Sequence, residues 1–103
     1  MTTTAQLYAE LWISLASLLR SYTAVHGISS KRQAIVEQDE EHISVRNGQH
    51  SLELLRQRAI VIWKREDGRA GTLELTEAGT LRSGDAEEEM DMAAEQWARE
   101  LMR

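Results

Sequence analysis

The chain has 103 residues, 42% of them hydrophobic, and no cysteine, so it can form one domain with a modest core but neither a disulfide nor a thiolate metal site. Its formal net charge of −5 arises in residues 85–103, which carry seven acidic and two basic side chains, whereas residues 1–84 carry ten of each. Because no basic stripe is present, we expect no nucleic-acid partner.

The first predicted element is a helix that begins at a capping Thr3 or Thr4, runs to about Val25 and stops at His26-Gly27. Its polar side chains occupy an arc of about 120°, which leaves an apolar surface about twice as wide as a helix on a sheet needs. We therefore expect it to contact the sheet and, in addition, either the second helix or the same helix of another subunit. The apolar side chains are Leu7, Tyr8, Leu11, Trp12, Leu15, Ala16, Leu18, Leu19 and Tyr22.

The apolar stretch 11–19 of this helix could be mistaken for a signal peptide or a membrane segment. It is far shorter than a membrane span, no positive residue precedes it, and no small-residue cleavage site follows it. We expect no membrane partner and a cytoplasmic location.

The next part of the chain predicts three strands of an antiparallel meander, after a short polar connection. The strands are expected at 33–38, 41–46 and 49 to about 55, with turns at 39–40 and 47–48. If each turn has two residues, Val36, Ile43 and Leu52 lie side by side on one face. Residues 52–58 could also form a single helical turn, but we favour a strand.

Asp67-Gly68 predicts a tight hairpin between two strands rich in aliphatic and β-branched residues. With a two-residue turn, four apolar residues share one face and need a cover, whereas Val61 and Trp63 lie on the opposite, outer face. These four residues are Ile60, Ile62, Leu73 and Leu75.

The last part of the chain predicts a bend at 78–79, a short edge piece at Thr80–Arg82 and a final helix capped by Asp85, with Glu88 as its reciprocal partner. Leu81 could instead act as a hydrophobic staple in front of this helix. The helix has a single apolar stripe, so its own chain can cover it. The stripe consists of Ala86, Met90, Ala93, Ala94, Trp97 and Leu101.

These elements predict one α+β domain over residues 1–103. It has a long N-terminal helix, an antiparallel meander of five to six strands and a C-terminal helix, with the helices packed on the sheet.

One side-chain row could carry chemistry. In the register of two-residue turns, Glu37 pairs with His42, and His42 pairs with Glu53. An imidazole between two carboxylates can bind a divalent metal or act as an oriented base, which makes this row a weak metal-site candidate. Exposed cross-strand charges give the same pattern and are our preferred interpretation, so we expect no metal, no catalytic residue and no cofactor.

We therefore hypothesise a non-catalytic protein-interaction module that acts as a homodimer. The apolar surplus of the first helix and the outer sheet face would supply the contacts to a ligand, a second subunit or another protein partner. The candidate contact residues are Tyr8, Trp12, Leu15, Leu19, Val61 and Trp63.

Two alternatives belong to other functional classes. One is a small apolar-ligand carrier with a pocket between the first helix and the sheet. Its lining residues would be Trp12, Trp97, Leu52, Ile60 and Leu73. The other is a metal-dependent enzyme that uses Glu37, His42 and Glu53.

Overall fold

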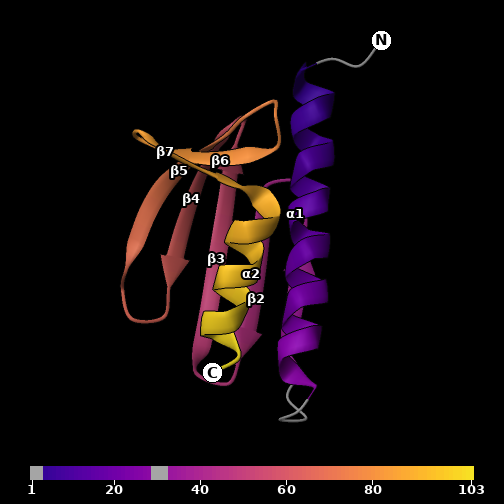
Figure 1. Cartoon of the computed structure of the whole chain (residues 1–103), viewed down its shortest axis with the longest axis vertical. Helices are drawn as coiled ribbons and strands as arrows, with labels where there is room; N and C mark the ends of the chain where they lie inside the picture. The colour runs from indigo at the N-terminus through magenta and orange to yellow at the C-terminus, as the bar shows by residue number, and fades with distance from the viewer. Residues whose placement is uncertain (1–3, 29–32) are drawn as a thin grey trace.

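The computed structural model describes residues 4–28 and 33–103, which form a helix, seven antiparallel strands and a second helix (Figure 1). The helices are α1 (Thr4–Gly27) and α2 (Met90–Leu101), and the strands are β1 (Ile35–Gln38), β2 (His42–Asn47), β3 (His50–Gln57), β4 (Ile60–Arg65), β5 (Ala70–Leu75), β6 (Thr80–Ser83) and β7 (Ala86–Glu89). The strands pair in chain order, β1 to β7, so the sheet is one meander. The α+β arrangement is confirmed, with seven strands rather than five to six. The possible cap at Thr3 and most of the connection after α1 lie outside the described residues.

Both helices lie on one face of the sheet, which we call the inner face, and they run side by side in the same direction (Figure 1). The core forms where their apolar side chains meet those of the inner face. Its sheet residues include Ile43, Val45, Leu52, Leu54, Val61, Leu75 and Leu81. The opposite sheet face, the outer face, has no helix against it within the described residues.

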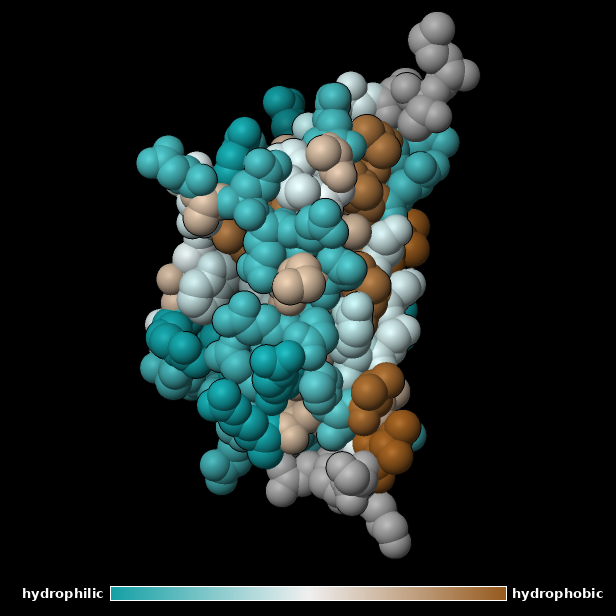
Figure 2. Space-filling view, viewed as in Figure 1, coloured by the Kyte–Doolittle hydropathy of each residue, from teal (hydrophilic) through white to brown (hydrophobic). Residues whose placement is uncertain are grey.

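The wide apolar surface of α1 is covered within the chain. Trp12 is 1% exposed, and Leu15 and Leu19 are fully buried, because α1 contacts both α2 and β1. The second contact of α1 is therefore α2, so α1 needs no other subunit to bury these residues. The large apolar side chains of α1 that stay exposed are Ile13 (54%) and Val25 (62%). Figure 2 shows apolar patches along this helix beside a mostly hydrophilic surface over α2.

Polar contacts fix the positions of the two helices. The indole N–H of Trp12 donates to the carbonyl oxygen of Asp39 (2.9 Å), and the guanidinium of Arg56 lies 5.7 Å from the centre of the same ring. At the far end of α2, the side-chain amide of Asn47 donates to the carbonyl oxygen of Leu101 (2.9 Å). This bond satisfies a carbonyl that the end of a helix leaves without an intrahelical partner.

The first two turns differ from the expected ones, but the faces of the strands do not. Val36 pairs with Val45, and Val45 pairs with Leu52, so each partner is two residues away from the predicted one. A shift of two residues keeps every side chain on its face, since side chains alternate with period two. In the first turn, the Asp39 carboxylate accepts the N–H groups of Glu41 and His42, which moves the turn one residue along the chain.

The hairpin at Asp67-Gly68 corrects a prediction. Its loop has three residues, 66–68, and Gly68 has a φ of 91°. This is the common three-residue hairpin, in which a turn is followed by a left-handed residue. The extra residue shifts the register between β4 and β5 by one residue, so Val61 pairs with Leu73 on the inner face. The four apolar residues that were predicted to share one face therefore lie on two faces. Leu73 and Leu75 face the helices, whereas Ile60 and Ile62 lie on the outer face, each 40% exposed.

The predicted start of the final helix is also wrong. Residues 86–89 form β7, and α2 begins at Met90 without a side-chain cap. Gly84 has a φ of 60° and, with Asp85, makes a two-residue turn between β6 and β7. Gly-Asp is a hairpin signal, and here it outweighs the capping tendency of Asp85.

The register of β4 can be tested with two neighbouring residues. Val61→Ala removes two buried methyl groups and is expected to lower the free energy of unfolding by about 2 kcal/mol. Ile62→Ala removes more atoms, but from the outer face, where the cross-strand contact with Leu55 is worth only about 0.5–1 kcal/mol. Urea unfolding at a protein concentration low enough to exclude self-association measures both values, and a larger loss in Ile62→Ala would contradict the observed register.

Candidate functional site

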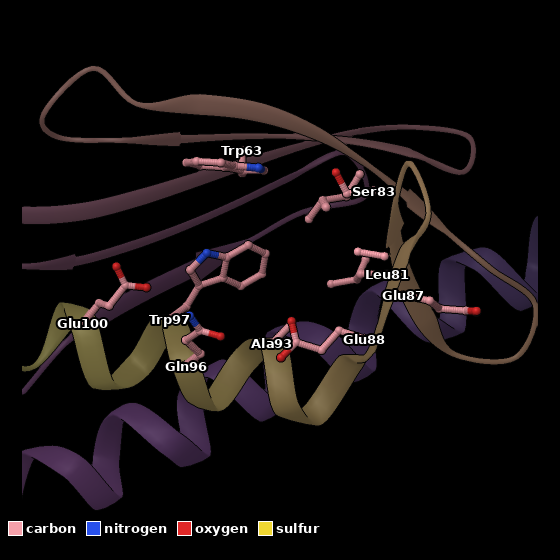
Figure 3. Close-up of a pocket in the computed structure, with 11 residues that line it drawn as sticks. Trp63, Leu81, Ser83, Glu87, Glu88, Ala93, Gln96, Trp97 and Glu100 are labelled. Carbon is pink, nitrogen blue, oxygen red and sulfur yellow. The ribbon is translucent and has the colours of Figure 1, made fainter.

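An open cleft of about 470 Å³ lies between α2 and the half of the sheet formed by β4 to β7 (Figure 3). We call it the tryptophan cleft, because Trp63 on the sheet and Trp97 on α2 both project into it. It is lined by Trp63, Leu73, Leu81, Ser83, Ala86, Glu87, Glu88, Ala93, Gln96, Trp97 and Glu100. The volume lies in the range typical of ligand sites.

Trp63 lies flat against the sheet because its cross-strand partner is Gly71. A Cβ atom on Gly71 would lie 2.5 Å from Nε1 of the Trp63 indole, so only glycine leaves room for the ring here. Figure 3 shows this indole above the cleft, with Trp97 pointing toward it from α2. Leu73 and Leu81 also line the cleft and supply apolar surface.

The α2 wall of the cleft is held by a buried arginine. The side chain of Arg65 is only 3% exposed, and it contacts the carboxylates of Glu66 (3.1 Å) and Glu100 (3.3 Å). Its Nε–H also donates to the carbonyl oxygen of Ser51 (2.9 Å). Because Glu100 belongs to α2 and Arg65 to β4, this ion pair joins the two walls at one end of the cleft.

Glu66 is the acidic group most strongly affected by this network. The backbone N–H of Ser51 donates to its carboxylate (2.9 Å), and the guanidinium of Arg65 lies beside it. Both interactions favour the ionised form and lower the pKa of Glu66 from 4.5 to about 2.

The cleft also has an acidic edge on β7. Glu88 pairs with Leu81, so it lies on the inner face, and it is exposed. In Figure 3 its carboxylate reaches from β7 toward Ala93 and Gln96 on α2, whereas Glu87 points away. Glu87 accepts a hydrogen bond from the hydroxyl of Thr80, while Glu88 forms no ion pair within the described residues.

The predicted contact residues lie in different places. Trp12, Leu15, Leu19 and Val61 are buried in the core. Tyr8 is half-buried and borders a separate hollow near the start of α1. Trp63, which the sequence placed on the outer face, lines the tryptophan cleft instead.

The residues predicted to line a pocket between the first helix and the sheet also lie in different places. Trp97 and Leu73 line the cleft, but Trp12 and Leu52 are core residues and Ile60 lies on the outer face. The cleft therefore lies against α2 rather than α1.

The proposed row of Glu37, His42 and Glu53 does not form as predicted. Ser44 lies between the two glutamates, and His42 pairs with Leu55. Glu37 instead contacts the guanidinium of Arg46 (3.5 Å). Across residues 4–28 and 33–103, no three histidine, aspartate or glutamate side chains are grouped so that they could hold a metal ion.

Comparisons with protein-family models, curated proteins and solved structures found no match. In the part of the chain that the structure describes, neither helix combines the length and hydropathy that a membrane span requires.

Sequence reasoning missed the roles of Gly71 and Glu88. Gly71 can be recognised as the cross-strand partner of Trp63 only once the loop at 66–68 is known to have three residues, since a two-residue turn places Thr72 opposite Trp63. The helix start predicted at Asp85 places Glu88 on that helix. The Gly84-Asp85 pair was the signal that could have placed it on a strand.

The Glu66 interactions predict a specific pH dependence of stability. The folded pKa of Glu66, about 2, is below its ordinary value of 4.5, so its ionised form contributes stability that is fully present above pH 4.5 and is lost as the pH falls toward 2. Glu66→Gln should lower the free energy of unfolding by about 1 kcal/mol at pH 7, which is below the usual range for a hydrogen bond to a charged group because Glu66 is partly exposed. Urea unfolding at several pH values should show a weaker acid loss in this variant, and an unchanged acid profile would contradict the assignment.

Proposed function

We propose that this protein is a non-catalytic interaction module that binds an apolar side chain of a protein partner in the tryptophan cleft. The observation that carries the proposal is the pair of partly exposed indoles, Trp63 and Trp97, that project into one cleft from separate elements. Tryptophan is enriched among the residues that dominate binding energy at protein interfaces, because it buries a large rigid surface at little entropic cost. The space that Gly71 leaves for the Trp63 indole supports a preformed site, since this indole already lies flat on the sheet in the unbound chain.

The openness of the cleft favours a protein partner over a free small molecule. Small-molecule sites typically enclose most of the ligand surface, whereas the rim residues Glu87, Glu88 and Gln96 are exposed to solvent. A side chain presented by another protein can enter such a cleft while its backbone stays outside.

The polar groups of the cleft support binding rather than catalysis. Glu100 is neutralised by Arg65, and Arg69 lies 3.8 Å from the same carboxylate oxygen. Ser83 is the hydroxyl group of the lining, and no histidine accompanies it there to act as a base.

The small apolar-ligand carrier is kept as the second candidate, with its pocket at the tryptophan cleft. The cleft volume of about 470 Å³ supports it. Tryptophan fluorescence against a panel of fatty acids and aromatic compounds decides between the two candidates. Saturable quenching or a spectral shift by a free ligand would favour the carrier.

The binding proposal predicts the outcome of a peptide selection. Peptides selected from a random library on the wild-type protein should bind the Trp97→Ala variant about 30-fold more weakly, the loss of one tryptophan that contributes about 2 kcal/mol. Isothermal titration calorimetry measures the affinities. Ile13→Ala is the matched control, because it removes exposed apolar surface from α1, outside the cleft. Equal binding to wild type and Trp97→Ala would overturn the assignment of the cleft.

We also propose the homodimer, but on a different surface from α1. Leu55 and Ile62 are cross-strand partners on the outer face, and Ile60 lies beside them, so three large side chains are each about 40% exposed in one patch. Sedimentation velocity should show a dimer that Ile62→Glu converts to a monomer, because a charge would then be buried in the contact. A wild-type chain that stays monomeric at every concentration tested would exclude the dimer.

A further inference from the structure

The net negative charge of the protein arises in a stretch of chain whose elements line the tryptophan cleft, and three of its acidic residues, Glu87, Glu88 and Glu100, are part of the lining. Residues 85–103 carry seven acidic and two basic side chains, which accounts for the whole net charge of −5. The same residues form β7 and α2, the two elements that close the cleft opposite β4 and β5. A segment of positive charge is therefore attracted to these two elements, and a phosphate group is repelled.

One carboxylate in the cleft is available to a partner. Glu100 is engaged by Arg65, and Glu87 points away from the cleft toward its contact with Thr80. Glu88 lies on the inner face, extends toward α2, and forms no ion pair within the described residues. A charged donor that enters between β7 and α2 meets this carboxylate.

The indoles favour the same kind of partner. The face of a tryptophan ring attracts a guanidinium or ammonium group, and the aliphatic stem of lysine or arginine packs on the ring as an apolar group. The protein already contains this contact in its core region, where Arg56 lies over the ring of Trp12. Trp63 and Trp97 offer comparable ring surface that no arginine of the described chain covers.

We propose that the tryptophan cleft binds a basic-apolar segment of a partner protein, in which one arginine or lysine packs its stem on Trp63 and Trp97 and places its charge beside Glu88. A neighbouring apolar residue of the segment packs on Leu73 and Leu81. This inference rests on the proposed function of the cleft and adds the chemistry of the partner. A neutral apolar peptide would use the indoles but leave Glu88 unpaired.

The test uses the full chain and two matched peptides. One is an acetylated, amidated five-residue peptide, Gly-Leu-Arg-Leu-Gly, and the other has citrulline in place of arginine, which keeps the shape and removes the charge. Binding is followed by NMR through the indole N–H signals of Trp63 and Trp97, which are assigned with the Trp63→Phe and Trp97→Phe variants.

The arginine peptide is expected to bind about fivefold more tightly than the citrulline peptide, the sum expected for an exposed cation–aromatic contact and an exposed ion pair. Raising the salt concentration should reduce this preference. Glu88→Gln should reduce it to about twofold, the part that the cation–aromatic contact supplies, whereas Glu53→Gln, which removes the same charge from the outer face, should preserve it. Thermal unfolding of both variants confirms that they fold like the wild type.

Two results would overturn the inference. Equal binding of the two peptides, with both lost in Trp97→Ala, would mean that the cleft binds apolar groups without regard to charge, and the proposed function would still stand. If neither peptide shifts the indole signals, the cleft does not take basic-apolar segments, and the peptide selection alone then decides whether it binds any partner.

Discussion

The burial of the wide apolar surface of α1 is the constraint on which the other features depend. Trp12, Leu15 and Leu19 are covered on one side by the sheet and on another by α2, so both helices must lie on the inner face. Full burial of three large side chains is worth several kcal/mol, of the order of the net stability of a small domain. The outer face receives no cover from either helix.

The tryptophan cleft follows from the same arrangement. Because α1 lies beside α2 and contacts β1, α2 alone is left to cover the inner face toward β7. It has 12 residues, and three of the side chains that it buries are alanines, which fill little space. Trp63 and Trp97 partly fill the volume that remains, and the rest is open. The cleft is thus a consequence of covering seven strands with two helices.

The sequence predicted the elements and most of their faces. The three strands of the first meander have the predicted faces although both turns moved, because each pairing changed by two residues. The predictions from the sequence were wrong where one or two residues determine the geometry of a turn. A single extra residue in the loop at 66–68 exchanged the sheet faces on which Val61 and Ile62 were predicted to lie. The turn at Gly84-Asp85 is followed by β7, where the sequence predicted the start of a helix. Period-two patterns cannot detect such changes, because both strand faces of the hairpin carry apolar residues.

The candidate site was largely beyond prediction for the same reason. The width of the apolar arc correctly indicated two contacts for α1, and of the two alternatives the structure selects α2. The cleft, however, depends on the pairing of Trp63 with Gly71 and on the placement of Glu88 on a strand. Both depend on turn geometry, which a hydrophobic pattern does not encode.

Hydrogen exchange of the tryptophan indole N–H groups is the most direct test of the central claim that a single chain covers α1. Trp12 is buried and donates to the carbonyl oxygen of Asp39, whereas Trp63 and Trp97 are partly exposed. One indole signal, assigned to Trp12, should therefore exchange far more slowly than the other two, with the same protection at low and high protein concentration. If Trp12 exchanged as fast as the other two, or were protected only at high concentration, α1 would not be covered within one chain.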